Sequence, residues 1–270
     1  MEILGKKIEA KFVHKSNVKN SDVDILMPAF KERTMSQLAA RSFFHFEKNL
    51  KLRLFFIDPS GKQKPFDAGP YQEHTSFISI PNEHFSVSKK SGKMSHSNAY
   101  CLEVGRQFCT APYVFVCHND VLAYREDWLS YLVDKMSAYK LAAFLRDNVR
   151  IKAAHVSGFL YTRDYFDKAV FWPQDFPEQD VGDNFSYYLQ RKNEPYFVCP
   201  CSHNNPKLLK KIHRRNPELK QITGDKCLDE KGNVIYIHTG RGTVKMLGHY
   251  KKANKTSYNK WNSFLQGIIK

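Results

Sequence analysis

Three polar residues follow directly on an apolar run, at the point where a strand would deliver them to the edge of a sheet. The run is Tyr113–Cys117 (YVFVC), and it is followed by His118, Asn119 and Asp120. A carboxylate and an imidazole in such a position could bind a divalent cation, which neutralises charge that builds on phosphate oxygens. Asn and Asp also favour ordinary turns, so the tripeptide by itself indicates a metal site only weakly.

Two further polar residues come at the end of apolar runs. Asp58 follows Leu52–Ile57 (LRLFFI) and opens the turn DPSG, while His238 ends Ile235–His238 (IYIH) before a glycine-rich turn. A turn-forming Asp and a surface His are the plain alternatives for these two positions. We predict instead that Asp58 reaches the same edge of a sheet as Asp120, whereas the two interpretations of His238 stay open at this point.

Three acids precede a helical pattern in the second half of the chain. Glu178, Asp180 and Asp183 lie just before Asn184–Gln190. A carboxylate within hydrogen-bond reach of a substrate hydroxyl can act as a general base. It removes the hydroxyl proton while the hydroxyl oxygen attacks an electrophilic atom. Asp183 is also placed to cap the helix, which would be a purely structural role.

Apolar runs alternate with helical patterns over the first half of the chain, which predicts an α/β fold. Helices are predicted at Thr34–Leu50 and His96–Cys109, and the predicted strands are 22–28, 52–57, 76–80 and 113–117. Strands that are apolar throughout indicate a mostly parallel sheet covered by helices on both faces. Ligands in such sheets bind at the carboxyl ends of the strands.

Two stretches of the chain resemble family 2 glycosyltransferases of the GT-A (Rossmann-like) fold. Residues 22–61 (DVDILMPAF…LRLFFIDPSG) resemble the family's opening strand with its terminal proline, then a helix, then a strand ending in aspartate. Residues 95–132 resemble the next block: an asparagine, a helix, a buried strand, an acidic motif and a trailing Trp-Leu. The resemblance covers a little under a third of the chain.

This resemblance implies a metal-dependent hexosyl- or pentosyltransferase that moves sugar from a nucleotide sugar, expected to be a UDP-sugar, to a hydroxyl with inversion. Asp120 would hold Mn²⁺ or Mg²⁺. The family's motif is usually Asp-x-Asp, and His118 replaces its first acid, so His118 would bind the ion or the ribose. His238 would supply a third ligand from the C-terminal part of the chain.

The resemblance also assigns residues to the donor and the acceptor. Asp58 would bind the uracil ring and Asn98 would lie near the diphosphate. Gly158–Arg163 would form a strand behind the acceptor, with Asp180 as the first choice for the base, Asp183 as the second and Glu178 as a third. The full set of expected donor contacts is Pro28, Ala29, Phe30, Asp58, Asn98, His118, Asn119 and Arg241.

Charge is distributed unevenly along the chain. Of the net charge of +15, residues 204–270 carry +11 (15 Lys and Arg against 4 Asp and Glu), which leaves +4 for residues 1–203. We therefore predict a catalytic domain at 1–203, with a nucleotide-sugar half (22–133) and an acceptor half (134–203). A basic C-terminal extension, 204–270, would pack on it.

The basic extension indicates a polyanionic acceptor, although a solvated basic surface is the plain alternative. Its segment 205–215 predicts a helix with proline at the first position and basic residues over most of its surface. DNA carrying a hydroxylated base is slightly favoured as acceptor. One alternative is a peripheral-membrane glycosyltransferase of bacterial surface glycan synthesis. Another is a non-catalytic nucleic-acid-binding module on a degenerate glycosyltransferase fold.

Compartment and oligomeric state are weakly constrained. The six cysteines are scattered, mostly within apolar runs, which predicts reduced core thiols and a cytoplasmic protein without a transmembrane segment. Cys199, Cys201 and His203 are too close together to predict a zinc site. The oligomeric state stays open.

Overall fold

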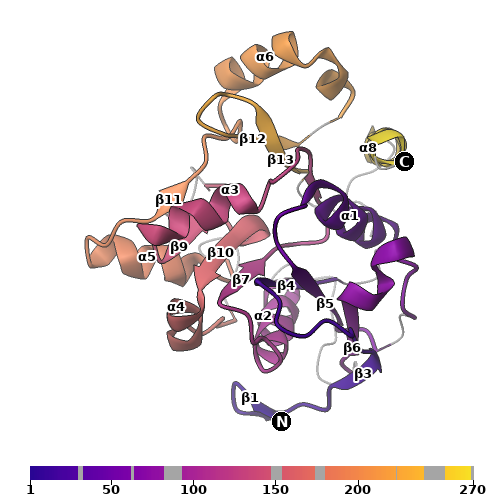
Figure 1. Cartoon of the computed structure of the whole chain (residues 1–270), viewed down its shortest axis with the longest axis vertical. Coiled ribbons are helices and arrows are strands. Elements are labelled where there is room, and N and C mark those ends of the chain that lie inside the picture. The colour runs from indigo at the N-terminus through magenta and orange to yellow at the C-terminus, as the bar shows by residue number, and fades with distance from the viewer. Residues whose placement is uncertain are drawn as a thin grey trace.

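The computed structural model describes most of the chain as an α/β fold (Figure 1). The described residues are 1–29, 33–61, 64–81, 93–146, 154–173, 180–222, 224–239 and 253–268. Three predicted site residues lie outside them: Phe30, Glu178 and Arg241.

The strands and helices follow the order that the apolar pattern predicts, with several short strands added. The strands are β1 (Glu2–Ile3), β2 (Lys6–Lys7), β3 (Lys11–His14), β4 (Val23–Pro28), β5 (Leu52–Asp58), β6 (Thr75–Ser79), β7 (Tyr113–Val116), β8 (Val121–Ala123), β9 (Leu141–Ala143), β10 (Phe159–Thr162), β11 (Phe197–Val198), β12 (Asp225–Leu228) and β13 (Val234–His238). The α-helices are α1 (Arg33–Phe46), α2 (Lys93–Arg106), α3 (Ser130–Val133), α4 (Arg163–Lys168), α5 (Asp183–Arg191), α6 (Pro206–Arg215) and α8 (Ala253–Ile268).

The main sheet has eight strands in the order β11-β9-β10-β7-β4-β5-β6-β3. Its centre, β7-β4-β5-β6, is parallel, whereas β10 runs antiparallel to both of its neighbours and β3 runs antiparallel to β6. Helices cover both faces of the sheet, and alternate residues of one strand pack against helices on opposite faces. Ile25 and Met27 of β4 pack with α1, and Leu26 packs with α2. The predicted α/β class with a mostly parallel sheet is confirmed.

The ends of the first two predicted helices, Thr34–Leu50 and His96–Cys109, differ from the prediction. The first helix begins at Arg33 and stops at Phe46, so Thr34 lies inside the first turn and Leu50 lies outside the helix. Buried Glu47 follows the helix, and its carboxylate accepts hydrogen bonds from the backbone N–H groups of Leu129 and Ser130, both at 3.0 Å. The second helix likewise ends at Arg106, earlier than predicted.

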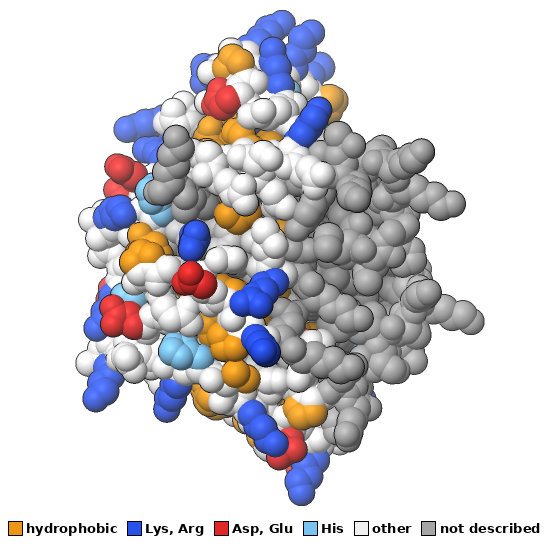
Figure 2. Space-filling model, turned by 90° about the vertical axis from the view of Figure 1, so that its right-hand side faces the viewer, with side chains coloured by type: hydrophobic (Ala, Val, Ile, Leu, Met, Phe, Trp, Pro, Cys, Tyr) orange, Lys and Arg blue, Asp and Glu red, His pale blue; other side chains and the backbone are white. Residues whose placement is uncertain are grey.

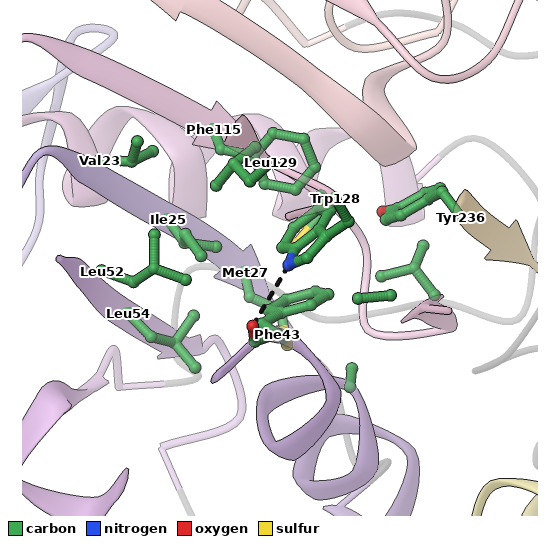
Figure 3. Packing of buried hydrophobic residues seen from close by; sticks show 14 of the residues in the cluster. Val23, Ile25, Met27, Phe43, Leu52, Leu54, Phe115, Trp128, Leu129 and Tyr236 are labelled. Atoms are coloured by element: carbon green, nitrogen blue, oxygen red, sulfur yellow. Dashed lines mark hydrogen bonds between the residues drawn. The ribbon is translucent and has the colours of Figure 1, made fainter. Parts of the chain in front are cut away.

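An aromatic stack joins the sheet to the C-terminal part of the chain (Figure 3). Trp128, which is fully buried, stacks on Phe43 of α1 at 4.8 Å and on Tyr236 of β13 at 5.7 Å between ring centroids. Its indole Nε1–H donates to the carbonyl of Phe43 at 3.2 Å, so the buried donor is satisfied. The stack fixes β13 relative to the main sheet.

A second sheet of three strands, in the order β12-β13-β8, also joins the C-terminal part of the chain to its first half. In it, Tyr236 pairs with Ala123 and His238 pairs with Val121. Residues from both sides of position 203 therefore share one sheet. The division of the chain at residue 203 stays a prediction. Among the described residues, no helix has both the length and the apolar character needed to cross a membrane.

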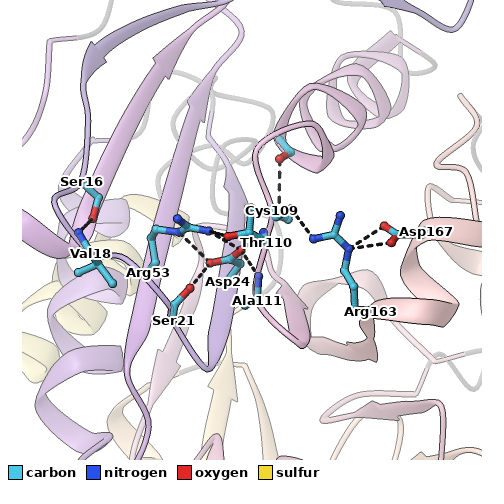
Figure 4. A network of polar contacts seen from close by, with 11 residues as sticks. Ser16, Val18, Ser21, Asp24, Arg53, Cys109, Thr110, Ala111, Arg163 and Asp167 are labelled. Carbon is cyan, nitrogen blue, oxygen red and sulfur yellow. Dashed lines mark hydrogen bonds and ion pairs between the residues drawn. The ribbon is translucent and has the colours of Figure 1, made fainter.

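A buried ion pair ties together the amino-terminal ends of the central strands, opposite the edge where ligands are expected (Figure 4). Asp24 has no exposed surface, and its carboxylate accepts hydrogen bonds from the Arg53 guanidinium at 2.9 and 2.8 Å. It also accepts from the Ser21 hydroxyl at 2.6 Å and from the backbone N–H groups of Thr110 and Ala111 at 2.6 and 2.9 Å. One carboxylate thus joins β4, β5 and the loop before β7.

Asp24→Asn is therefore expected to lower the free energy of unfolding by about 3 kcal/mol, because it leaves Arg53 without its charged partner and sets an amide N–H against backbone donors. Denaturant unfolding measures the change. Asp22→Asn is the matched control, since Asp22 is exposed and its carboxylate accepts from the backbone of Lys51. Equal stability of the two variants would show that the network contributes nothing specific.

Candidate functional site

The carboxyl ends of three neighbouring parallel strands lie side by side and lead into the candidate site. The backbone N–H of Ala29 donates to the carbonyl of Ile57 at 2.9 Å, and that of Cys117 donates to Leu26 at 3.0 Å. Ala29 and Asp58 are both buried at this edge. The predicted donor residues after β4, β5 and β7 thus share one edge of the sheet.

His118, Asp120 and His238 come together at this edge. One potential ligand atom from each residue lies within 4.8 Å of the others. The Nε2 atom of His238 is 3.6 Å from Oδ1 of Asp120. Pairing of β13 with β8 produces this contact, and the backbone N–H of Thr239 donates to the carbonyl of Asp120 at 2.9 Å. Three residues predicted as metal ligands are therefore neighbours in space.

A serine that the sequence did not single out lies between the two histidines. The hydroxyl of Ser157 is 2.7 Å from Nδ1 of His118 and 3.1 Å from Nε2 of His238. Ser157 belongs to the short 3₁₀ helix η4 (Val156–Gly158) just before β10, and it has no exposed surface. Serine in a turn is common, so no sequence signal marked it.

Each imidazole is also held from its outer side. The side-chain amide of Asn98 is 3.2 Å from Nε2 of His118, and Oδ2 of Asp225 is 3.8 Å from Nδ1 of His238. Asp225 in turn contacts Nδ1 of His203 at 3.1 Å. Outer contacts of this kind fix the ring orientation and the tautomer of a metal-binding histidine. Asn98 was predicted near the diphosphate, whereas Asp225 was not predicted at all.

The surroundings favour an uncharged His118 and an ionised Asp225. Desolvation lowers the pKa of His118, against the opposing charges of Asp120 and Asp180, and nearby His238 lowers that pKa further. Burial would raise the pKa of Asp225, but its contacts with His203 and His238 outweigh burial and hold that pKa below its usual range. A neutral imidazole is the form that binds a metal ion.

The donor set fits a divalent transition ion better than Mg²⁺. Two imidazoles and one carboxylate suit Mn²⁺ or a similar ion, while Mg²⁺ favours oxygen ligands alone. His238 and Asp120 are 8% and 3% exposed, so the protein has already excluded most water from two of the three side chains. Within the described part of the chain, this is the one group of His, Cys, Asp and Glu side chains close enough to hold an ion.

Of the two described acids, Asp180 lies just before α5 and Asp183 is its first residue, and their surroundings differ. Asp183 is 2% exposed, and its Oδ2 accepts the backbone N–H of Asp180 at 2.8 Å. Asp180 is half-buried, its Oδ1 accepts the backbone N–H of Val181 at 2.8 Å, and its charge acts on His118. Asp180 is thus the acid whose charge reaches the histidine cluster, while Asp183 holds the backbone around it.

The remaining predicted residues lie around the same edge with polar or packing contacts of their own. Oδ1 of Asp58 accepts from the backbone N–H and the hydroxyl of Ser60, at 2.8 and 2.7 Å. The Asn119 amide donates to the Ser36 hydroxyl at 3.2 Å and is buried beside α1. Pro28 is the last residue of β4 and is also buried. Asp58 therefore combines the turn role with a place at the strand end.

No family model matches the sequence, and no curated protein matches it. The chain is similar in structure to solved glycosyltransferases. A mannosyltransferase from Pyrobaculum calidifontis, in complex with GDP-Man and Mn²⁺, has a TM-score of 0.45 and 12% identity, over 98% of this chain and 77% of that one.

Two other solved structures are similar over about two thirds of this chain. Glucosyl-3-phosphoglycerate synthase from Mycobacterium tuberculosis, in complex with Mn²⁺ and UDP-glucose, has a TM-score of 0.44 and 11% identity, over 66% of this chain and 69% of that one. An active-site mutant of LgtC has a TM-score of 0.42 and 13% identity, over 65% of this chain and 72% of that one.

Proposed function

We propose that this chain is a metal-dependent glycosyltransferase that moves a sugar from a nucleotide sugar, a UDP-sugar first, to an acceptor hydroxyl. The observation that carries the proposal is the meeting of His118, Asp120 and His238 at the carboxyl edge of the parallel strands. A divalent ion bound there would neutralise the negative charge that develops on the departing diphosphate. The three side chains would hold that ion, and the structure fits the task because their ligand atoms converge.

Residues at neighbouring strand ends would bind the nucleotide. Asp58 is at the end of β5, where a carboxylate can accept hydrogen bonds from a base, and buried Ala29 adjoins it at the end of β4. Asn98 contacts His118 and is therefore close to the place of the diphosphate. Phe30 and Arg241, which lie outside the described residues, complete the proposed donor set from the sequence.

Asp180 is the proposed general base, acting with inversion at the anomeric carbon. In that step the acceptor oxygen forms the new bond to the anomeric carbon as the bond to the diphosphate breaks, and Asp180 takes the hydroxyl proton. The support is that its charge acts on His118 while its own backbone is held by Asp183. Asp183 is engaged with backbone, which makes it the weaker candidate.

The acceptor is proposed to be polyanionic, with DNA carrying a hydroxylated base as the first candidate. All four acids of residues 204–270 contact residues of 1–203, which leaves the outer surface basic. Each acid has one principal partner: Glu218 with Tyr124, Asp225 with His203, Asp229 with Arg125 and Glu230 with Lys135. Exposed lysines and arginines gather at the α6 end of the molecule (Figure 2).

Helix α6 is the densest part of this surface. Asn205 caps it by accepting the backbone N–H of Leu208 at 3.0 Å, and Ile212 anchors it in a buried cluster. Its cations are all exposed: Lys207, Lys210, Lys211, Arg214 and Arg215. A rigid helix with five exposed cations is suited to phosphate contacts.

Binding to duplex DNA is therefore expected to weaken steeply with salt, with log affinity falling by about 0.9 per phosphate neutralised. A variant with four charge reversals, Lys210→Glu, Lys211→Glu, Arg214→Glu and Arg215→Glu, should weaken DNA binding and flatten its salt dependence. Its UDP affinity should not change. Gel-shift titrations at several salt concentrations measure both quantities. Anionic vesicles serve as the parallel ligand: tight vesicle binding with no DNA binding would favour a membrane-associated enzyme of surface glycan synthesis.

Release of UDP from UDP-sugars, with and without Mn²⁺, tests the enzymatic proposal itself. A glycosyltransferase is expected to release UDP slowly in the absence of acceptor and only when the ion is present. If no nucleotide sugar is bound or cleaved under either condition, while DNA is bound, the chain is instead a nucleic-acid-binding module without catalysis.

A further inference from the structure

Ser157 stands out as a fully buried hydroxyl directed at the two histidines of the proposed metal site. It is 0% exposed, and its oxygen lies 2.7 Å from Nδ1 of His118 and 3.1 Å from Nε2 of His238. That nitrogen of His238 is also the atom 3.6 Å from Oδ1 of Asp120. The hydroxyl therefore belongs to the same cluster of facing donor atoms.

The backbone around Ser157 is fixed on both sides, so the hydroxyl is held in this place. Its N–H donates to Nδ1 of His155 at 3.2 Å, and its carbonyl accepts from the Tyr236 hydroxyl at 2.6 Å. The next residue, Gly158, is packed so closely that a Cβ atom there would lie 3.3 Å from Phe144 and from Tyr236. Tyr236 precedes His238 by two residues on β13. The hydrogen bond to Tyr236 therefore couples the position of Ser157 to that of His238.

The distances between these atoms match neighbouring ligands of one ion. With metal–ligand distances of about 2.1 Å, adjacent donors of an octahedral complex lie about 3 Å apart. An ion on the Ser157 side requires the proton of each ring to sit on the other nitrogen, which faces the Asn98 amide at 3.2 Å on His118 and Oδ2 of Asp225 at 3.8 Å on His238. A hydroxyl oxygen among imidazole and carboxylate donors is acceptable to Mn²⁺.

We propose that the Ser157 hydroxyl is a fourth protein ligand of the divalent ion, beside His118, Asp120 and His238. The inference rests on the metal site of the proposed function and extends it. With four protein donors, fewer positions on the ion would remain for diphosphate oxygens and water. The serine would also hold the two imidazoles at ligand spacing before the ion binds.

The proposal is tested by measuring Mn²⁺ binding to the purified chain without nucleotide. Calorimetry and electron paramagnetic resonance of the ion both measure that binding. Ser157→Ala is expected to weaken Mn²⁺ binding by about tenfold or more. Ser42→Ala is the matched control, because Ser42 is also a buried serine that donates to one carbonyl and accepts one N–H, and it should bind Mn²⁺ like the wild type.

Ser157→Cys distinguishes a ligand from a residue that only positions the histidines. With Co²⁺ bound, a direct ligand gives a thiolate-to-cobalt charge-transfer band in the near ultraviolet, and the wild type gives none. Absence of this band, or Mn²⁺ affinity unchanged in Ser157→Ala, would overturn the proposal while leaving the three-residue site intact. Failure of the wild type to bind Mn²⁺ at all would overturn both the metal site and this inference.

Discussion

Asp120→Asn is expected to abolish sugar transfer and to remove the Mn²⁺-dependent part of UDP binding, while the fold survives. Asp120 is the one carboxylate among the converging ligand atoms, and it is 3% exposed. An amide in its place loses the negative charge that offsets a divalent ion next to two neutral imidazoles. Because the ion would bridge protein and diphosphate, the loss should affect nucleotide binding as well as the chemical step.

Calorimetry with UDP, in the presence and absence of Mn²⁺, measures the binding part of this prediction. Asp134→Asn is the matched control, since it makes the same change in charge at an exposed residue of the 3₁₀ helix η3 (Asp134–Ser137). Mn²⁺-dependent UDP affinity that is equal in the two variants would remove Asp120 from the metal site.

Asp180→Asn is expected to lower the transfer rate by about two to four orders of magnitude, the usual scale for loss of a general base. UDP binding with Mn²⁺ should stay near that of the wild type, because the residue acts on the acceptor. Single-turnover kinetics with saturating donor measures the rate, and calorimetry measures the binding.

Asp183→Asn provides the comparison for Asp180. Its carboxylate accepts the backbone N–H of Asp180 at 2.8 Å and is buried, so the expected change is mainly a loss of stability. A crippled rate in Asp183→Asn with a mild effect in Asp180→Asn would reverse the two roles. Normal rates in both variants would argue against an inverting mechanism with a base at this position.

The central strands are predictable from the sequence because their burial is continuous. Every residue of β4 is buried, as are all residues of β5 except Arg53, so the apolar runs mark both strands directly. The edge of the sheet follows from strand direction alone, since residues after parallel strands gather at one side. Strand order and direction are therefore enough to bring Asp58, His118 and Asp120 to the same edge.

Other parts of the site depend on contacts between distant segments, which no local pattern in the sequence describes; His238 was expected there from the family resemblance alone. β8 has only three residues, and its pairing with β13 brings His238 to Asp120, 118 residues away along the chain. Asp225 acquires its place only through β12, which pairs with β13. Ser157 lies in a 3₁₀ turn whose position is fixed by Tyr236 rather than by any local pattern.

A crystal structure with Mn²⁺ and a UDP-sugar tests the central claim most directly, using the anomalous signal of manganese to locate the ion. The account predicts one strong anomalous peak in contact with His118, Asp120 and His238 and with oxygens of the diphosphate, with the uracil near Asp58. Manganese bound away from these three residues, or a nucleotide sugar bound at another edge of the sheet, would contradict it.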